Sequence, residues 1–133
     1  MGKGKGGDLH RKCVEWVEAI SRTPDTIVTR ERILGGVKLV DVLIYTLSNK
    51  KLVGVEVQLR ATSHALRNIE LDLAAGCEEV LIASPYPNVL AGVRRKVESI
   101  MPWYRERVNY LLVEFLPSEN KKRIRAISRN KTE

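Results

Sequence analysis

Two neighbouring strand-like segments of this chain are each interrupted by an acid. Residues 37–47 form a β-branched and apolar run broken by Asp41, and residues 52–60 alternate Glu56 and Gln58 with apolar side chains. A carboxylate inside a strand is costly unless it has a partner, and a divalent cation is a common reason for two carboxylates to converge. Because residues 48–51 read as a hairpin loop, the fold has to bring these acids near one another.

The composition is typical of one compact soluble domain. The chain has 133 residues, of which 44% are hydrophobic and 29% charged. No apolar run is long enough to span a bilayer, and no apolar segment follows the glycine-rich start as in a secretory signal. We expect a single domain over residues 1–133, with flexible tails at 1–7 and 129–133, in a cytoplasmic protein. Cys13 and Cys77 lack metal-ligand spacing and are expected to be reduced.

The excess of basic over acidic residues indicates a polyanionic partner. The formal net charge is +7 and the basic residues are clustered, for example at residues 94–96 and 121–125. Nucleic acid is therefore the leading partner class, and no membrane partner is expected. The alternative is a thermophile-type surface, rich in Lys, Arg and Glu and poor in Gln.

Hydrophobic periodicity predicts an α/β fold with a mixed central sheet flanked by helices. The expected order is αβββαβα followed by a C-terminal strand pair. A parallel, right-handed crossover should join the third strand to the fourth. Trp16 and Trp103 are expected in the core or at a dimer interface. The expected elements are helices at 9–21, 62–75 and 89–100, and strands at 26–34, 37–47, 52–60, 79–84, 109–116 and 122–128.

Hairpin register decides whether the acids share a face. If Leu47 pairs with Leu52, Asp41 lies opposite Gln58, and Asp41, Glu56 and Gln58 lie on one face of the hairpin. The Cα atoms of Asp41 and Glu56 would then be roughly 7–8 Å apart. A three-residue loop would instead turn Asp41 to the other face. The competing interpretation is that Glu56 and Gln58 are the solvated side of an ordinary half-buried strand.

A helix, a hairpin carrying an Asp, a Glu-x-Lys-like strand and a following βα unit resemble the PD-(D/E)XK nuclease superfamily. That superfamily includes restriction endonucleases and archaeal Holliday-junction resolvases, and the resemblance covers about residues 6 to 100. Asp41 matches the metal-binding Asp, although Val40 stands where proline often precedes it. Glu56 matches the first motif residue, and Gln58 stands in place of the Lys. The resemblance implies an αβββαβ restriction-endonuclease-like core.

The same resemblance implies a metal-dependent DNA endonuclease, with a resolvase-like, structure-selective form as one option, and a homodimer. Mg²⁺ or Mn²⁺ would be held by Asp41, Glu56 and the Val57 carbonyl, with His10 as a further ligand. Asp41, Glu56 and Gln58 would be catalytic, with Glu15 on the first helix. Basic residues on the first three expected strands and on the second helix would contact DNA: Arg30, Arg32, Lys38, Arg60 and Arg67.

Gln58 leaves three alternatives open. An amide can position water but carries no charge and cannot act as a base. The site can work with Gln in place, or Lys38 or Arg67 can supply the missing cation. The third alternative is a catalytically inactive nucleic-acid-binding protein that retains the nuclease fold. His10 and Glu15 can equally be surface residues of the first helix.

Overall fold

The computed structural model describes residues 3–34 and 38–114, with the side chains of residues 3–6, 31–34 and 38 excepted. These residues form one five-stranded sheet in the order β1-β2-β3-β4-β5. Three helices and a 3₁₀ helix accompany the sheet. The elements are α1 (Lys3–Ser21), β1 (Thr26–Leu34), β2 (Lys38–Thr46), β3 (Lys51–Val57), α2 (Ser63–Ala74), β4 (Glu79–Ser84), α3 (Pro87–Ile100), η1 (Pro102–Arg107) and β5 (Val108–Leu112).

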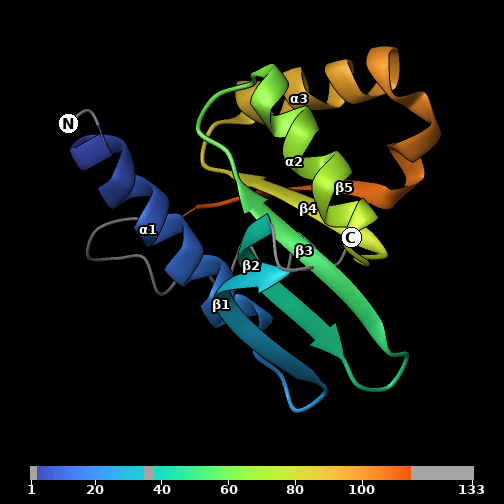
Figure 1. The fold of residues 1–133 in the computed structure, drawn as a ribbon. Helices are drawn as coiled ribbons and strands as arrows, with labels where there is room; N and C mark the ends of the chain where they lie inside the picture. The colour runs from blue at the N-terminus through green and yellow to red at the C-terminus, as the bar shows by residue number, and fades with distance from the viewer. Residues whose placement is uncertain (1–2, 35–37, 115–133) are drawn as a thin grey trace.

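Helix α1 lies on one side of the sheet and α2 and α3 on the other (Figure 1). Each face of the sheet carries its own apolar core. On one face, α1 packs Cys13, Val14 and Val17 against Val42 and Val55 of the central strands. On the other face, α2 and α3 pack against buried residues of β4 and β5. Burial of apolar surface on both faces explains why β4 reads as a nearly continuous apolar run.

Strand direction changes at β3, in the middle of the sheet. β1, β2 and β3 are antiparallel neighbours, whereas β3, β4 and β5 run parallel. The helices α2 and α3 make the two parallel crossovers, since parallel neighbours need a long connection. The expected α/β class, mixed sheet and parallel pairing of β3 with β4 are therefore confirmed.

Several element bounds differ from those expected. Helix α1 begins at Lys3 rather than residue 9, so it includes part of the segment expected as a tail, and β3 ends at Val57 rather than residue 60. The first closing strand is β5, which joins β4 in parallel. The second, at residues 122–128, lies outside the described residues. Both cysteines are buried and neither forms a disulfide, in agreement with the expected reduced state. No helix among residues 3–34 and 38–114 is long and apolar enough to cross a membrane.

The hairpin register is two residues away from the expected one. Thr46 pairs with Lys51 and Leu43 with Gly54, so the loop covers residues 47–50. Asp25 holds the end of β2, since its carbonyl accepts the Leu47 N–H at 2.7 Å and its Oδ1 accepts the Ser48 N–H at 3.0 Å. The chain then reverses within residues 47–50, where Lys50 takes a left-handed φ of 57°, so that β3 begins with Lys51 opposite Thr46. A shift of two residues preserves the face of each side chain in a regular ladder, so the change matters only where the ladder ends, near Asp41.

Candidate metal site

Asp41 is linked to both α1 and β3 through one carboxylate oxygen. Its Oδ2 accepts the backbone N–H of Val57 at 2.8 Å and lies 3.2 Å from Nε2 of His10. The Asp41 side chain is 16% exposed and that of His10 34% exposed. The ladder between β2 and β3 runs from Thr46 to Val42, so the carboxylate stands where a backbone carbonyl of β2 would continue it. The first carboxylate is thus joined directly to the segment that carries Glu56 and Gln58.

The alternation of side chains along β2 is interrupted at Asp41. Val42 belongs to the core on the α1 side. Val40 instead lies 3.5 Å from the position that a Cβ on Gly54 would occupy, beside Asp72 of α2. Residues two apart in a regular strand share a face, so Val40 and Val42 on opposite faces mark an irregularity between them. The irregularity turns Asp41 towards His10.

Glu56 and Gln58 are buried at the end of β3. Glu56 is 3% exposed and Gln58 9% exposed. Glu56 lies between Val55 and Val57, which face α1, so its side chain points to the α2 and α3 side. The expectation that Asp41 shares one face with Glu56 and Gln58 is therefore wrong. Asp41 lies just beyond Val42, the last residue of β2 that pairs with β3. Its carboxylate accepts the Val57 N–H, as a backbone carbonyl of β2 would in a continued ladder.

The backbone N–H of Gln58 is hydrogen-bonded, whereas its side-chain amide is not, as far as the described residues are concerned. Its N–H donates to the Ala83 carbonyl at 2.9 Å, which extends the pairing of β3 with β4. Within residues 3–34 and 38–114, its side-chain amide has no hydrogen-bond partner. Gln58 as a residue is 9% exposed, but its amide is not among the fully buried polar atoms without a partner in the described ranges, so the amide still reaches solvent. The amide is thus available to hold a water molecule or a ligand oxygen.

The structure does not bring Glu15 to this group. Glu15 is exposed on α1, where its Oε2 lies 3.1 Å from Arg11 and 3.8 Å from Arg30. Arg30 also pairs with Glu18 at 3.0 Å. These two expected functional residues, Glu15 and Arg30, therefore meet each other in a surface ion-pair network.

The remaining basic candidates lie in different positions. Arg60 and Arg67 are exposed, after β3 and on α2 respectively. Neither makes an ion pair with another residue of the described part of the chain. Arg32 and Lys38 belong to β1 and β2, but their side chains lie outside the described set. Among the five basic candidates, Arg60 and Arg67 are therefore the two whose described side chains remain open to a phosphate.

The oxygen atoms of this site suit a hard cation, but the side chains do not surround a metal ion on all sides. Asp41, Glu56 and the Val57 carbonyl offer oxygen ligands, which Mg²⁺ prefers. No group of three or more His, Cys, Asp or Glu residues in the described ranges is arranged to hold a metal ion. Mg²⁺ commonly takes only one or two carboxylates and keeps waters or substrate oxygens for the other positions. The residues present fit that mode and no richer one.

Two features were not recognised in the sequence. Asp72 is fully buried on α2, with Oδ2 3.3 Å from the position that a Cβ on Gly54 would occupy. Its spacing from Ile69, on the buried helix face, was the available signal. Trp16 is buried as expected, whereas Trp103 is 70% exposed, so Trp103 is not a core residue and the other expected position, a dimer interface, stays a prediction. Trp103 lies in η1, which has no buried residue.

Among known proteins, the chain matches no model of a protein family, no curated protein and no solved structure.

Proposed function

We propose that this protein is a metal-dependent endonuclease that hydrolyses phosphodiester bonds in DNA. The observation that carries the proposal is the hydrogen bond from the Val57 N–H to Asp41, between two buried polar residues, Glu56 and Gln58. Acids are disfavoured in such strands. The hydrogen bond from the Val57 N–H offsets part of the free-energy cost of placing Asp41 there. The order of helix, three antiparallel strands and a parallel βα unit also agrees with the restriction-endonuclease-like core that the sequence resembles.

Each residue has a distinct task in this proposal. Mg²⁺ or Mn²⁺ would bind beyond the end of the β2–β3 ladder at Val42, between the two faces of the sheet, with Asp41 from the α1 side, Glu56 from the other side and the Val57 carbonyl as oxygen ligands. The bound ion would supply Lewis-acid activation of phosphate and water. The Val57 N–H fixes one Asp41 oxygen, which leaves the other for a ligand. The Gln58 amide can donate a hydrogen bond to the attacking water or to a phosphate oxygen. Arg67, exposed at the α2 surface, can pair with a phosphate of the DNA backbone.

Cleavage of several DNA forms tests the proposal. Linear, supercoiled and four-way-branched DNA are incubated in parallel with Mg²⁺ or Mn²⁺. Asp41→Asn and Glu56→Gln should each lower the cleavage rate by at least about 100-fold, since each removes a charged oxygen ligand. Glu70→Gln, on the exposed face of α2, is the control and should cut at the wild-type rate. An absence of cutting in every substrate and metal would reject the enzyme.

Gln58 can be tested separately because a lysine is the residue expected by resemblance. Gln58→Lys should keep or raise the cleavage rate, and Gln58→Leu should lower it while leaving DNA binding intact. An unchanged rate in Gln58→Leu would remove Gln58 from the catalytic set. A homodimer, as paired cuts require, would be detected by sedimentation with and without branched DNA.

A catalytically inactive nucleic-acid-binding protein is the second candidate. It is favoured by the absence of a three-residue metal cluster within the described ranges and by the contact of Asp41 with His10. In that case Asp41 serves the fold alone. DNA binding that is insensitive to divalent metal and unaffected by Glu56→Gln would support this candidate over the nuclease.

A further inference from the structure

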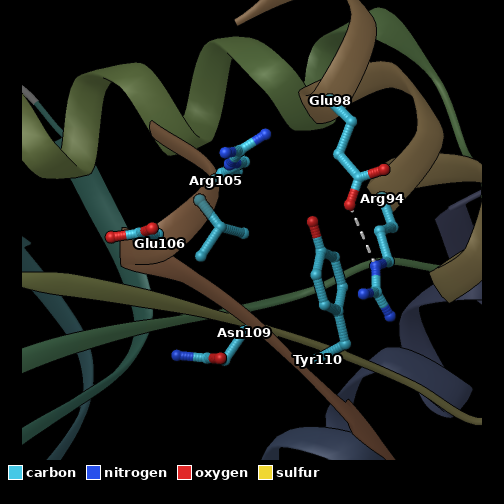
Figure 2. Close-up of a pocket in the computed structure, with 7 residues that line it drawn as sticks. Arg94, Glu98, Arg105, Glu106, Asn109 and Tyr110 are labelled. Atoms are coloured by element: carbon cyan, nitrogen blue, oxygen red, sulfur yellow. Dashed lines mark hydrogen bonds and ion pairs between the residues drawn. The ribbon is translucent and has the colours of Figure 1, made fainter. Parts of the chain in front are cut away.

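A polar groove lies where α3, η1 and β5 meet (Figure 2). Its volume is about 440 Å³, which falls within the ~300–1,000 Å³ range of small-ligand sites. It shares no residue with the candidate metal site. The lining residues are Arg94, Glu98, Arg105, Glu106, Val108, Asn109 and Tyr110.

The groove offers both hydrogen-bond donors and acceptors. Arg94 donates from Nε to Oε2 of Glu98 at 3.2 Å, so this pair is largely self-neutralised. The Tyr110 ring rises from β5 with its hydroxyl end towards Glu98 (Figure 2). The Tyr110 hydroxyl is protonated at neutral pH and can donate, and burial raises its pKa further, to about 12.

Arg105 and Glu106 carry the charges that remain open in the groove. Both are exposed residues of η1, and neither forms an ion pair inside the described part of the chain. Asn109, on β5, adds an amide whose Nδ2 binds Glu79 and whose oxygen remains as an acceptor. The groove therefore presents one cation and several acceptors rather than a uniformly basic surface.

An aromatic surface adjoins the groove. A second hollow is lined by Pro102, Trp103, Arg105 and Glu106, and thus shares Arg105 and Glu106 with the groove. Trp103 is 70% exposed there, the largest exposed fraction among the exposed large hydrophobic side chains of the described residues. An open indole beside a guanidinium is the combination with which proteins stack a base and hold its phosphate.

We propose that the groove and Trp103 bind an unpaired nucleotide. The base stacks on Trp103, Arg105 pairs with the phosphate, and Glu106 accepts from an amino group on the base edge. A purely anionic ligand would leave the two groove carboxylates opposed, and an aliphatic one would leave every polar lining group unpaired. The chemistry is the same for a free mononucleotide and for an unpaired position in a DNA strand.

Tryptophan fluorescence tests the site directly. Trp16 is 7% exposed, so changes caused by added ligand report mainly on Trp103. Wild-type protein in EDTA is titrated with a ten-residue deoxyadenosine oligonucleotide, with deoxyadenosine monophosphate, and with a blunt duplex. Saturable quenching by the single strand is expected, and quenching by the monophosphate as well would identify the free nucleotide as a sufficient ligand. Quenching by the duplex alone, or by none of the three, would overturn the proposal.

Variants separate the site from general electrostatics. Trp103→Ala should weaken single-strand affinity by about 5- to 150-fold, the loss equivalent to one stacked base. Arg105→Ala should weaken it more than Arg95→Ala, which removes the same charge from an exposed α3 residue outside the groove. Equal losses in the two arginine variants would overturn the proposal. A wild-type dimer in sedimentation that Trp103→Ala dissociates would also overturn it, in favour of a contact between copies.

The site is independent of the proposed cleavage chemistry. Asp41→Asn protein should still bind the oligonucleotide in a Trp103-dependent way even if no form of the protein cuts DNA. Cleavage by wild-type protein without Trp103-dependent binding would reject the groove and leave the nuclease in place.

Discussion

At the scale of single residues, Asp41 has a structural task whatever its chemistry. Its Oδ2 is the acceptor for the Val57 N–H, at the point where the β2–β3 ladder stops. A buried donor without an acceptor is costly. The acid that looked anomalous in a strand therefore contributes to closing the sheet, and changes at Asp41 have to be read for stability as well as activity.

Two substitutions at Asp41 should differ in stability. Asp41→Ala leaves the Val57 N–H without its acceptor and should cost about 1–3 kcal/mol. Asp41→Asn retains a carbonyl oxygen that can accept the same hydrogen bond, so its loss should be smaller. Urea unfolding of both variants measures the difference. Equal losses of unfolding free energy in the two variants would show that the negative charge of Asp41 beside His10 contributes more than its hydrogen bond to Val57.

Tyr110 should make stability fall at alkaline pH. Burial raises its pKa to about 12 from an ordinary value of 10.0, so the folded state keeps a proton that the unfolded state loses between these values. The contribution is complete below pH 10 and is lost as the pH rises towards 12. Wild type should therefore lose more stability than Tyr110→Phe between pH 9.5 and 11.5, by urea unfolding at each pH. Parallel curves for the two proteins would contradict the buried phenol.

At the scale of elements, local pattern predicted most of the fold. β4 was expected at residues 79–84 and occupies Glu79–Ser84. A short apolar run between two turn signals fixes both ends of a strand in the sequence. The hairpin register was missed because the residue pattern does not reveal the left-handed φ of Lys50, 57°, at which the chain turns into β3 opposite Thr46. The site was predicted in part: Asp41 does contact the Glu56–Gln58 segment, but through the backbone. Periodicity alone cannot foresee a side chain that replaces a ladder carbonyl.

The packing of α3 offers a prediction that belongs to this scale. A Cβ on Gly92 would lie 2.7 Å from Cβ of Ala61, in the segment after β3. Gly92→Ala should therefore cost about 1–3 kcal/mol from overpacking, despite the better helix propensity of alanine. Ala61→Gly in the same chain should restore part of the loss. The double-mutant cycle is measured by denaturant unfolding, and additive effects would rule out the contact.

At the scale of the whole molecule, the +7 charge does not act as one uniform surface. Several cations on the α1 side are paired with acids of α1: Arg11 of the same helix with Glu15, and both Arg22, which follows the helix, and Arg30 of β1 with Glu18. Such exposed pairs add little stability, but they reduce the positive potential on that side. Helix α2 covers the other face of the sheet from α1 (Figure 1). Its exposed residue Arg67 makes no ion pair in the described part of the chain. DNA affinity should therefore depend more on the α2 side than on α1.

The salt dependence of DNA binding tests this asymmetry. Each phosphate contact contributes about 0.9 to the slope of log affinity against log salt on duplex DNA. Arg67→Ala should lower the slope by about 1, whereas Arg22→Ala removes the same formal charge from a pair with Glu18 and should leave the slope nearly unchanged. Fluorescence anisotropy at several salt concentrations between about 0.05 and 0.3 M spans the range in which such slopes are resolved. Equal decreases for both variants would mean that net charge, rather than a phosphate contact on α2, controls binding.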